Sequence, residues 1–195
     1  MWFDRETELA EIIGEAVDSD CTVLDVGGGN GKLSKRVAEI TGARVHICDV
    51  GTQRMRGLTY LPMDRPDALP CGDATFDVVL MAFMLHHLAN RDLQERILRE
   101  AARVARRRIV LLEDTAEGQI ERVLNAAWDL LLNVPQGIPT PLNFRSIAGW
   151  ERALRVSGFV NVRSRRFRGM WPILRSYQQA VIVGDVASPA VTTSG

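Results

Sequence analysis

Short apolar runs alternate along this chain with segments in which apolar residues recur every three or four positions. The runs are typical of buried strands and cover residues 21–26, 45–49, 58–61, 76–83 and 109–112. Helical spacing is found at residues 9–17, 33–40 and 93–104, and Asn90 is a candidate N-cap for the last of these. Strands that alternate with helices predict a parallel β-sheet with helices on both faces.

The last third of the chain follows a different pattern. Residues 120–132 fit a long amphipathic helix, and a proline-interrupted loop follows at residues 134–144. A further helix is expected at residues 147–156, with Gly158 as its C-terminal stop. Two strands are expected near residues 160–167 and 178–183, and a turn at 169–175 would allow them to pair antiparallel.

A glycine-rich loop joins the first strand to the next helix. It reads Asp25-Val26-Gly27-Gly28-Gly29-Asn30-Gly31. Glycine allows a tight turn and lets a ligand approach the main chain, and the following helix offers free N–H groups at its start. Dinucleotide-binding folds use G-x-G-x-x-G in this position, but the third glycine of that pattern would fall on Lys32.

The spacing D-x-G-x-G-x-G resembles motif I of the class I S-adenosylmethionine-dependent methyltransferases. The resemblance implies that the loop passes under the methionine part of the cofactor and that Asp25 lies near its amino group. Asp49 ends the second strand, as the ribose-binding acid of that family does, with Val50 beside it. The resemblance extends over residues 20–112. The cofactor-binding residues it implies are Asp25, Gly27, Gly28, Gly29, Asn30, Gly31, Asp49, Val50, Asp64 and Met81.

Two of these assignments depend on weaker matches. The stretch from Asp64 to Pro70 resembles the family segment whose first acid meets the adenine amino group, but Arg65 occupies the expected position, and one inserted residue restores Asp64. The segment from Met81 to Leu88 resembles the family's "L-H-H" stretch, which lies beneath the sulfonium. It gives His87 and His86 as catalytic candidates, with Glu113 or Asp114 as alternative bases. Asp114 has a second interpretation, as the cap of the helix that follows.

The fold class expected is therefore α/β, a Rossmann-like parallel sheet flanked by helices with a C-terminal antiparallel β-hairpin. We expect one domain over residues 1–184 and a disordered tail at 185–195. Within the domain, the helix of residues 1–19 and an insert at 117–145 are expected to cover the acceptor pocket. Candidate lining residues are Trp2, Phe3, Trp128, Asn133, Phe144 and Arg145, with core packing the favoured interpretation for Trp128.

Composition and charge limit the classes of substrate and the cellular locations to be expected. The 24 basic residues balance the 24 acidic ones, so no global field draws the chain to nucleic acid or to a membrane. Three widely spaced cysteines, the charged N-terminus and the lack of a long apolar run predict a cytoplasmic protein without a structural metal.

These features favour S-adenosylmethionine-dependent methyl transfer to a small-molecule acceptor. The basic clusters at residues 103–108 and 163–168 leave RNA or protein as alternative acceptors. A protein that binds S-adenosylmethionine without transferring its methyl group and a nicotinamide oxidoreductase remain as further alternatives. The identity of the acceptor, the atom that is methylated and the oligomeric state are left open by the sequence.

Overall fold

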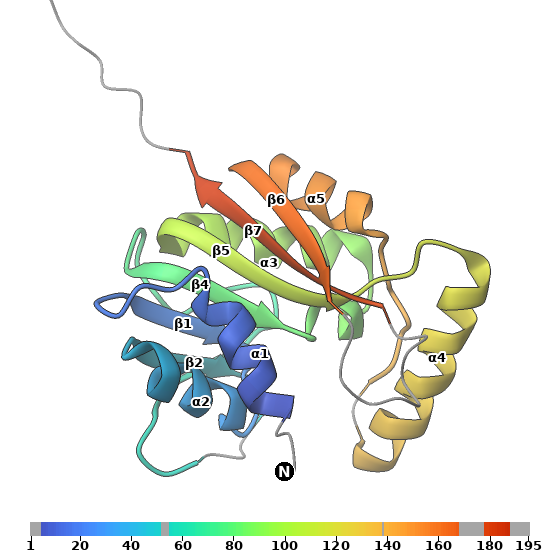
Figure 1. The fold of residues 1–195 in the computed structure, drawn as a ribbon, viewed down its shortest axis with the longest axis horizontal. Coiled ribbons are helices and arrows are strands. Elements are labelled where there is room, and N and C mark those ends of the chain that lie inside the picture. The colour runs from blue at the N-terminus through green and yellow to red at the C-terminus, as the bar shows by residue number, and fades with distance from the viewer. Residues whose placement is uncertain (1–4, 52–54, 138, 168–177, 188–195) are drawn as a thin grey trace, which may run out of the picture.

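One seven-stranded sheet organises the chain in a computed structural model that describes residues 5–51, 55–137, 139–167 and 178–187 (Figure 1). The strands, in chain order, are β1 (Thr22–Val26), β2 (Arg44–Asp49), β3 (Thr59–Pro62), β4 (Phe76–Ala82), β5 (Ala105–Asp114), β6 (Phe159–Phe167) and β7 (Gln179–Val186). Their order across the sheet is β3-β2-β1-β4-β5-β7-β6. The first five strands are parallel, and β7 runs antiparallel between β5 and β6.

Helices cover both faces of this sheet. They are α1 (Arg5–Gly14), α2 (Lys32–Thr41), α3 (Arg91–Val104), α4 (Gln119–Asn133) and α5 (Ile147–Val156), with the short 3-10 helices η1 (Leu85–His87) and η2 (Val134–Gln136). Figure 1 shows α1 and α2 on one face and α3 and α5 on the other, whereas α4 projects beyond the end of the sheet.

Alternation along the strands explains the two layers. In β4, Val78 and Leu80 pack with the residues of α1 and α2, while Val79 and Met81 pack with those of α3 and α5. All four side chains are almost completely buried, because successive residues of a strand point to opposite faces and both faces are covered. Continuous apolar runs in the sequence are the consequence of this double burial.

The chain reverses its direction of travel across the sheet at β1. β1 pairs in parallel with β2 on one side and with β4 on the other, so the connections that follow β1 and β4 leave toward opposite edges. The carboxyl ends of these strands meet at one end of the sheet, and ligands of open α/β folds bind in the crevice at such a reversal. The glycine loop and the two histidines follow strands that end there, and Asp49 is the last residue of β2.

The expected fold is confirmed, with differences at several boundaries. β3 begins one residue later than expected, and β5 extends to ten residues because it continues beyond the fully apolar run at both ends. β7 continues to Val186, so Asp185 pairs with Arg108 in the sheet instead of starting a tail. The two C-terminal strands are antiparallel as expected, but the turn at 169–175 and residues 188–195 lie outside the described residues.

Two further expectations concern single residues and the membrane. Asn90 caps α3, since its side-chain oxygen accepts a hydrogen bond from the Leu93 N–H at 2.9 Å. Among the described residues, the search for a helix with the length and apolarity of a membrane span finds none. The cytoplasmic location stays a prediction.

Removing the Asn90 cap is expected to destabilise the protein. The cap satisfies one of the first N–H groups of α3, and α3 contributes buried side chains such as Leu98 to the core. Asn90→Ala should lower the free energy of unfolding by about 1 kcal/mol, and Asn90→Ser, which keeps a capping oxygen, by a smaller amount. Urea denaturation measures both. Equal losses in the two variants would contradict the capping role.

Candidate active site

The glycine loop between β1 and α2 depends on backbone angles that other residues rarely adopt. Gly27, Gly29 and Gly31 have φ values of 74°, 54° and 86°. A Cβ atom at Gly31 would lie 2.6 Å from the Tyr60 hydroxyl oxygen, and one at Gly27 would lie 2.9 Å from the Met84 Cβ. Gly29 differs, because no described heavy atom lies within 4 Å of its ideal Cβ position. Packing therefore explains two of the glycines, while the third presents its main chain to open space.

Asp25 lies beneath this loop and is almost completely buried. Its Oδ2 accepts a hydrogen bond from the Ser34 hydroxyl at 2.5 Å, and a Cβ at Gly28 would approach the same oxygen to 2.7 Å. Its other oxygen, Oδ1, is buried and has no hydrogen-bond partner among the described residues. Burial raises the pKa of Asp25 to about 7, although the Ser34 hydroxyl acts in the opposite direction. A buried carboxylate with an unsatisfied oxygen is suited to a cationic ligand group.

Asp49 connects the end of β2 to the glycine loop. One oxygen accepts the Gly29 N–H at 2.8 Å and the other accepts the Gly51 N–H at 2.5 Å. Val50 beside it is 63% exposed. The carboxylate thus lies at the carboxyl end of β2 beside the glycine loop, and it can accept further hydrogen bonds because each oxygen has two lone pairs.

The loop is also held from β3. The Tyr60 hydroxyl donates to the Asn30 carbonyl at 2.9 Å, and the Asn30 side chain accepts from the Lys32 N–H at 3.1 Å. Both contacts fix the start of α2, so Asn30 has a structural role that does not depend on ligand binding.

Two sequence candidates have a different environment. Asp64 is exposed in the loop after β3, and the adjacent Arg65 pairs with Asp67 at 3.1 Å. Met81 is completely buried against the α3 and α5 side of the core. The Met81 side chain thus packs in the core, and its assignment as a cofactor-binding residue stays a prediction.

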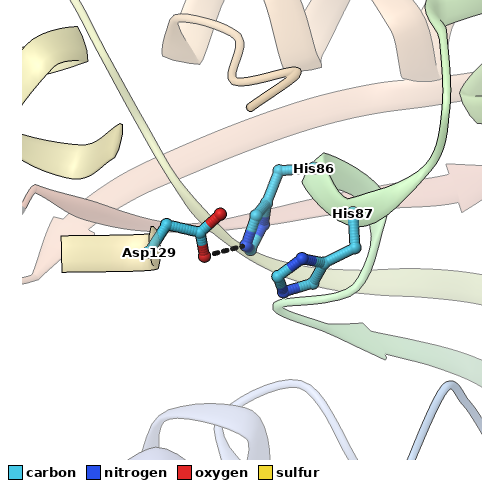
Figure 2. Close-up of side chains that lie close together, drawn as sticks. All are labelled: His86, His87 and Asp129. Carbon is cyan, nitrogen blue, oxygen red and sulfur yellow. Dashed lines mark ion pairs between the residues drawn. The ribbon is translucent and has the colours of Figure 1, made fainter. Parts of the chain in front are cut away.

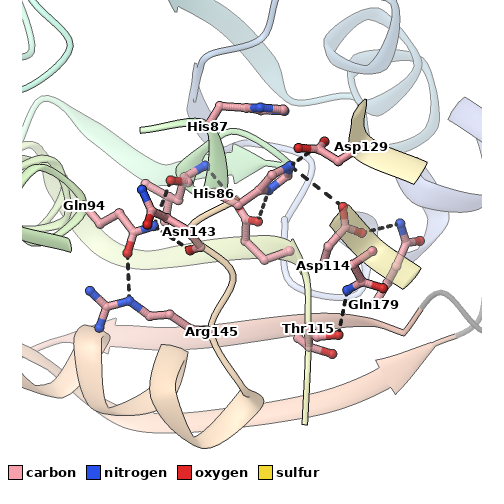
Figure 3. A network of polar contacts seen from close by, with 12 residues as sticks. His86, His87, Gln94, Asp114, Thr115, Asp129, Asn143, Arg145 and Gln179 are labelled. Carbon is pink, nitrogen blue, oxygen red and sulfur yellow. Dashed lines mark hydrogen bonds and ion pairs between the residues drawn. The ribbon is translucent and has the colours of Figure 1, made fainter. Parts of the chain in front are cut away.

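The two histidines follow β4 in η1, where they differ sharply in environment (Figure 3). His86 is 2% exposed, its ring stacks on Phe144, and its Nδ1 lies 2.6 Å from Glu113 Oε2. The other oxygen of Glu113 accepts the Leu85 N–H at 2.7 Å. Glu113 on β5 therefore fixes both the backbone of η1 and the orientation of the His86 ring.

Two more carboxyl groups lie near the opposite nitrogen of the His86 ring. Asp129 Oδ1 is 3.6 Å and Asp114 Oδ2 is 3.9 Å from His86 Nε2. Burial alone would lower the pKa of His86, but Glu113, Asp129 and Asp114 together raise it to about 10.

His87 is partly buried, and its pKa is shifted in the opposite direction to that of His86. Its Nδ1 lies 2.9 Å from the Pro139 carbonyl oxygen, which can only accept, so Nδ1 carries the proton and the neutral ring leaves a lone pair on Nε2. Burial and the neighbouring His86 lower the pKa of His87, and Asp129 only partly opposes them.

The insert at residues 117–145 covers these histidines, but with a polar face. In α4, Asn125 donates to the Thr115 carbonyl at 3.0 Å and Asp129 approaches His86, and both residues are buried. The apolar stripe of the helix points outward instead, with Ile120 77%, Val123 67% and Leu131 62% exposed. The helix is present as predicted from its amphipathic pattern, and its polar face is the one that contacts the histidines.

The other candidate lining residues have mainly structural contacts. Phe144 stacks on His86, Asn133 donates to Asp129 at 2.5 Å, and Trp128 is half-buried. Arg145 is buried, donates to Gln94 at 2.7 Å and lies over the Trp150 ring, so it belongs to the scaffold.

The N-terminal helix reaches the same crevice with its first residue. The Arg5 guanidinium lies 5.1 Å from the centroid of the Phe83 ring, directly after β4, while Leu9 and Ile13 pack into the core. Trp2 and Phe3 lie outside the described residues.

Sequence reasoning missed part of this site. Glu113 was considered as a base, yet it is completely buried and holds His86, and Asp114 accepts from Gln179 at 2.9 Å instead of capping α4, which Gly118 precedes. Asp129 was not identified at all. The available signal was its four-residue spacing from Asn125, which places two polar side chains on one face of α4.

Comparison with known proteins agrees with the architecture. Residues 23–108 match the model of a family described as "Methyltransferase domain". No curated protein sequence matches the chain.

Three solved structures illustrate the likeness of fold. One is the complex between the Haloferax volcanii Trm112 methyltransferase activator and a methyltransferase, with a TM-score of 0.73 and 18% identity over 95% of this chain and 91% of that one. An S-adenosylmethionine-dependent methyltransferase from Methanosarcina mazei gives 0.71 and 16% over 91% and 98%. A Haemonchus contortus phosphoethanolamine N-methyltransferase in complex with S-adenosylhomocysteine gives 0.67 and 10% over 94% and 52%.

The buried Asp25 is expected to make stability depend on pH. Because its pKa is raised from 3.8 to about 7 by folding, the folded state holds a proton that the unfolded state has lost, and wild-type stability falls as pH rises between these values. Asp25→Asn should be little changed at pH 4 relative to wild type and more stable by up to about 4 kcal/mol above pH 7.

Chemical denaturation of both proteins from pH 4 to pH 8 measures this difference. Ser34→Ala removes the hydroxyl that favours the Asp25 carboxylate and should extend the pH-dependent range upward. A stability difference between wild type and Asp25→Asn that does not change with pH would show that this carboxyl group titrates normally.

Proposed function

We propose that this chain transfers the methyl group of S-adenosylmethionine to a small-molecule acceptor bound in a crevice bordered by the glycine loop and the histidines of η1. The observation that carries the proposal is the direct approach of these two segments. Gly27 lies so close to Met84, one residue before η1, that no Cβ would fit between them. A ligand on the loop is therefore proposed to lie near η1, which carries His87.

The loop has the features that the cofactor requires. The buried Oδ1 of Asp25 lacks a hydrogen-bond partner among the described residues, and the proposed partner is the amino group of the methionine part. The open side of Gly29 leaves room over the main chain. Asp49, at the carboxyl end of β2, is proposed to accept hydrogen bonds from both ribose hydroxyls, with Val50 and Asp64 toward the adenine.

The proposed task of the protein is alignment and charge control. S-adenosylmethionine, when bound, supplies a methyl group on a sulfonium, and in-line displacement needs an acceptor held on the opposite side. Glu113 holds His86 in one orientation, and η1 thereby holds His87 at the crevice. The lone pair of neutral His87 can accept a hydrogen bond or a proton from the acceptor, or bind a cation. We assign His86 a positioning role, because Glu113 fixes its ring.

Charge supports a small acceptor over a nucleic acid. Glu113, Asp114 and Asp129 surround the histidines, and an acidic site repels phosphates. The arginine clusters that suggested RNA pair with acidic side chains on the described surface. These pairs are Arg103 with Asp73 and Glu100, Arg106 with Asp77, Arg107 with Asp18, Arg108 and Arg163 with Asp185, Arg165 with Glu15 and Arg166 with Glu117.

Calorimetric titration with S-adenosylhomocysteine tests the cofactor site. Wild type should bind it in preference to NADH, and Asp49→Asn should bind about 10- to 100-fold more weakly, because a charge-assisted hydrogen bond contributes about 1.5–3 kcal/mol. Asp18→Asn is the matched control, since this exposed aspartate pairs with Arg107, next to the amino end of β5. Preference for NADH, or equal affinity in Asp49→Asn and wild type, would refute the proposed site.

The acceptor class is tested separately with radiolabelled S-adenosylmethionine. Pools of small hydroxyl, amine and thiol compounds should be methylated, while RNA and unfolded protein should not, because the acidic crevice under α4 excludes polyanions. Label in RNA or protein would instead identify a macromolecular acceptor. Cofactor binding with no labelled product in any pool would favour a protein that binds S-adenosylmethionine without transferring its methyl group.

A further inference from the structure

We propose that His86, His87 and Asp129 form a binding site for a divalent transition-metal ion beneath α4. A ring nitrogen of each histidine and a carboxylate oxygen of Asp129 all lie within 4.8 Å of one another. Figure 2 shows the two imidazole rings side by side on η1, with Asp129 reaching them from α4. Two histidines and one carboxylate are a ligand set that suits zinc, iron, cobalt or nickel and leaves positions for other ligands.

The distances inside the cluster fit a bridging ion better than direct hydrogen bonds. His86 Nε2 lies 3.6 Å from Asp129 Oδ1 and 3.9 Å from Asp114 Oδ2, both beyond hydrogen-bond range. Two ligands that each lie about 2.1 Å from a tetrahedral ion are about 3.4 Å apart. The separation of His86 Nε2 and Asp129 Oδ1 is thus close to that of two ligands of one ion.

A polar atom without a partner points to the same ligand. Asp129 is 1% exposed, and its Oδ2 is buried without a hydrogen-bond partner among the described residues. The Oδ1 atom of the same carboxylate already accepts from Asn133 and lies nearest to His86. An unsatisfied carboxylate oxygen is costly to bury, and a metal ion would satisfy it.

The charge balance also favours a cation. Three buried carboxyl groups, Glu113, Asp114 and Asp129, face the single buried imidazole of His86. The carboxyl groups thus outnumber the buried imidazole ring that they surround, and buried acidic groups are usually paired or coordinate metal ions. A divalent ion would offset that excess.

The groups around the histidines resemble the outer partners of metal ligands. Glu113 accepts from His86 Nδ1 at 2.6 Å, which leaves Nε2 directed at Asp129. The Pro139 carbonyl holds the His87 ring through its Nδ1. Metal-binding histidines commonly have one nitrogen held by a carboxylate or a backbone carbonyl, which fixes the ring for coordination.

A catalytic role for this metal ion rests on the proposed function, methyl transfer to a small-molecule acceptor. An ion at this position would lie at the acceptor side of the crevice and could bind an acceptor oxygen, lowering the pKa of its hydroxyl and making it a better nucleophile. The proton would then leave to solvent, so the lone pair of His87 would serve as a ligand and no protein base would be needed. Metal binding itself requires no methyl transfer.

Titration of the chelator-treated protein with Co²⁺ tests the site. We expect one Co²⁺ per chain with visible d–d absorption, displaced by Zn²⁺. Asp129→Asn and His87→Ala should each weaken binding by at least tenfold, and Glu113→Gln by about 10- to 100-fold, the usual cost of removing an outer partner of a metal ligand. His46→Gln is the matched control, because His46 lies on β2 against Phe76, outside the cluster, and binding should be unchanged.

Two results would overturn the proposal. One is the absence of a Co²⁺ spectrum in wild type, which would identify the cluster as an ion pair between His86 and its carboxylates. The other is a spectrum that persists in Asp129→Asn, or that shows thiolate charge transfer from the free cysteines such as Cys71. S-adenosylhomocysteine titration and thermal melts on the same samples verify that each variant is folded, and they separate failure of the metal site from failure of the cofactor site.

Discussion

The parallel pairing of β1 with both β2 and β4 determines where every functional group of this protein can lie. Because the chain leaves β1 toward one edge of the sheet and leaves β4 toward the other, the carboxyl ends of these strands border a single crevice. The glycine loop follows β1 on one side, and η1 follows β4 on the other. The close approach of Gly27 and Met84 joins the two sides, so the glycine loop and η1 lie next to each other.

A second constraint acts beside η1. Glu113 is completely buried on β5 and uses both oxygens to hold η1, one on the Leu85 N–H and one on His86. Since β5 is fixed by its pairing with β4 and β7, the sheet determines the orientation of the histidines through Glu113. α4 completes the site from the other side by directing Asp129 inward. The acidic character of the site therefore comes from two successive elements, β5 and α4.

Much of this arrangement could be predicted from local patterns. Buried parallel strands are apolar on both faces, which makes them recognisable in the sequence. Asp25 and Asp49 lie near the carboxyl ends of β1 and β2, and the spacing of the glycines beside them identified both as candidate ligand-binding residues. What could not be predicted depends on tertiary contacts. The amphipathic pattern of α4 did not specify which face turns inward; in the described part of the helix the polar face with Asp129 contacts the histidines, while Ile120, Val123 and Leu131 are exposed. The side-chain burial of Met81 likewise follows from strand register, which the resemblance did not specify.

The crystal structure of the protein with S-adenosylhomocysteine tests the central claim most directly. The account predicts the homocysteine part over Gly27–Gly29 with its amino group toward Asp25 Oδ1, both ribose hydroxyls on Asp49, and the sulfur directed at the space beside His87. A ligand bound elsewhere, or one whose ribose lies away from Asp49 while Asp25 keeps its buried oxygen unsatisfied, would contradict it.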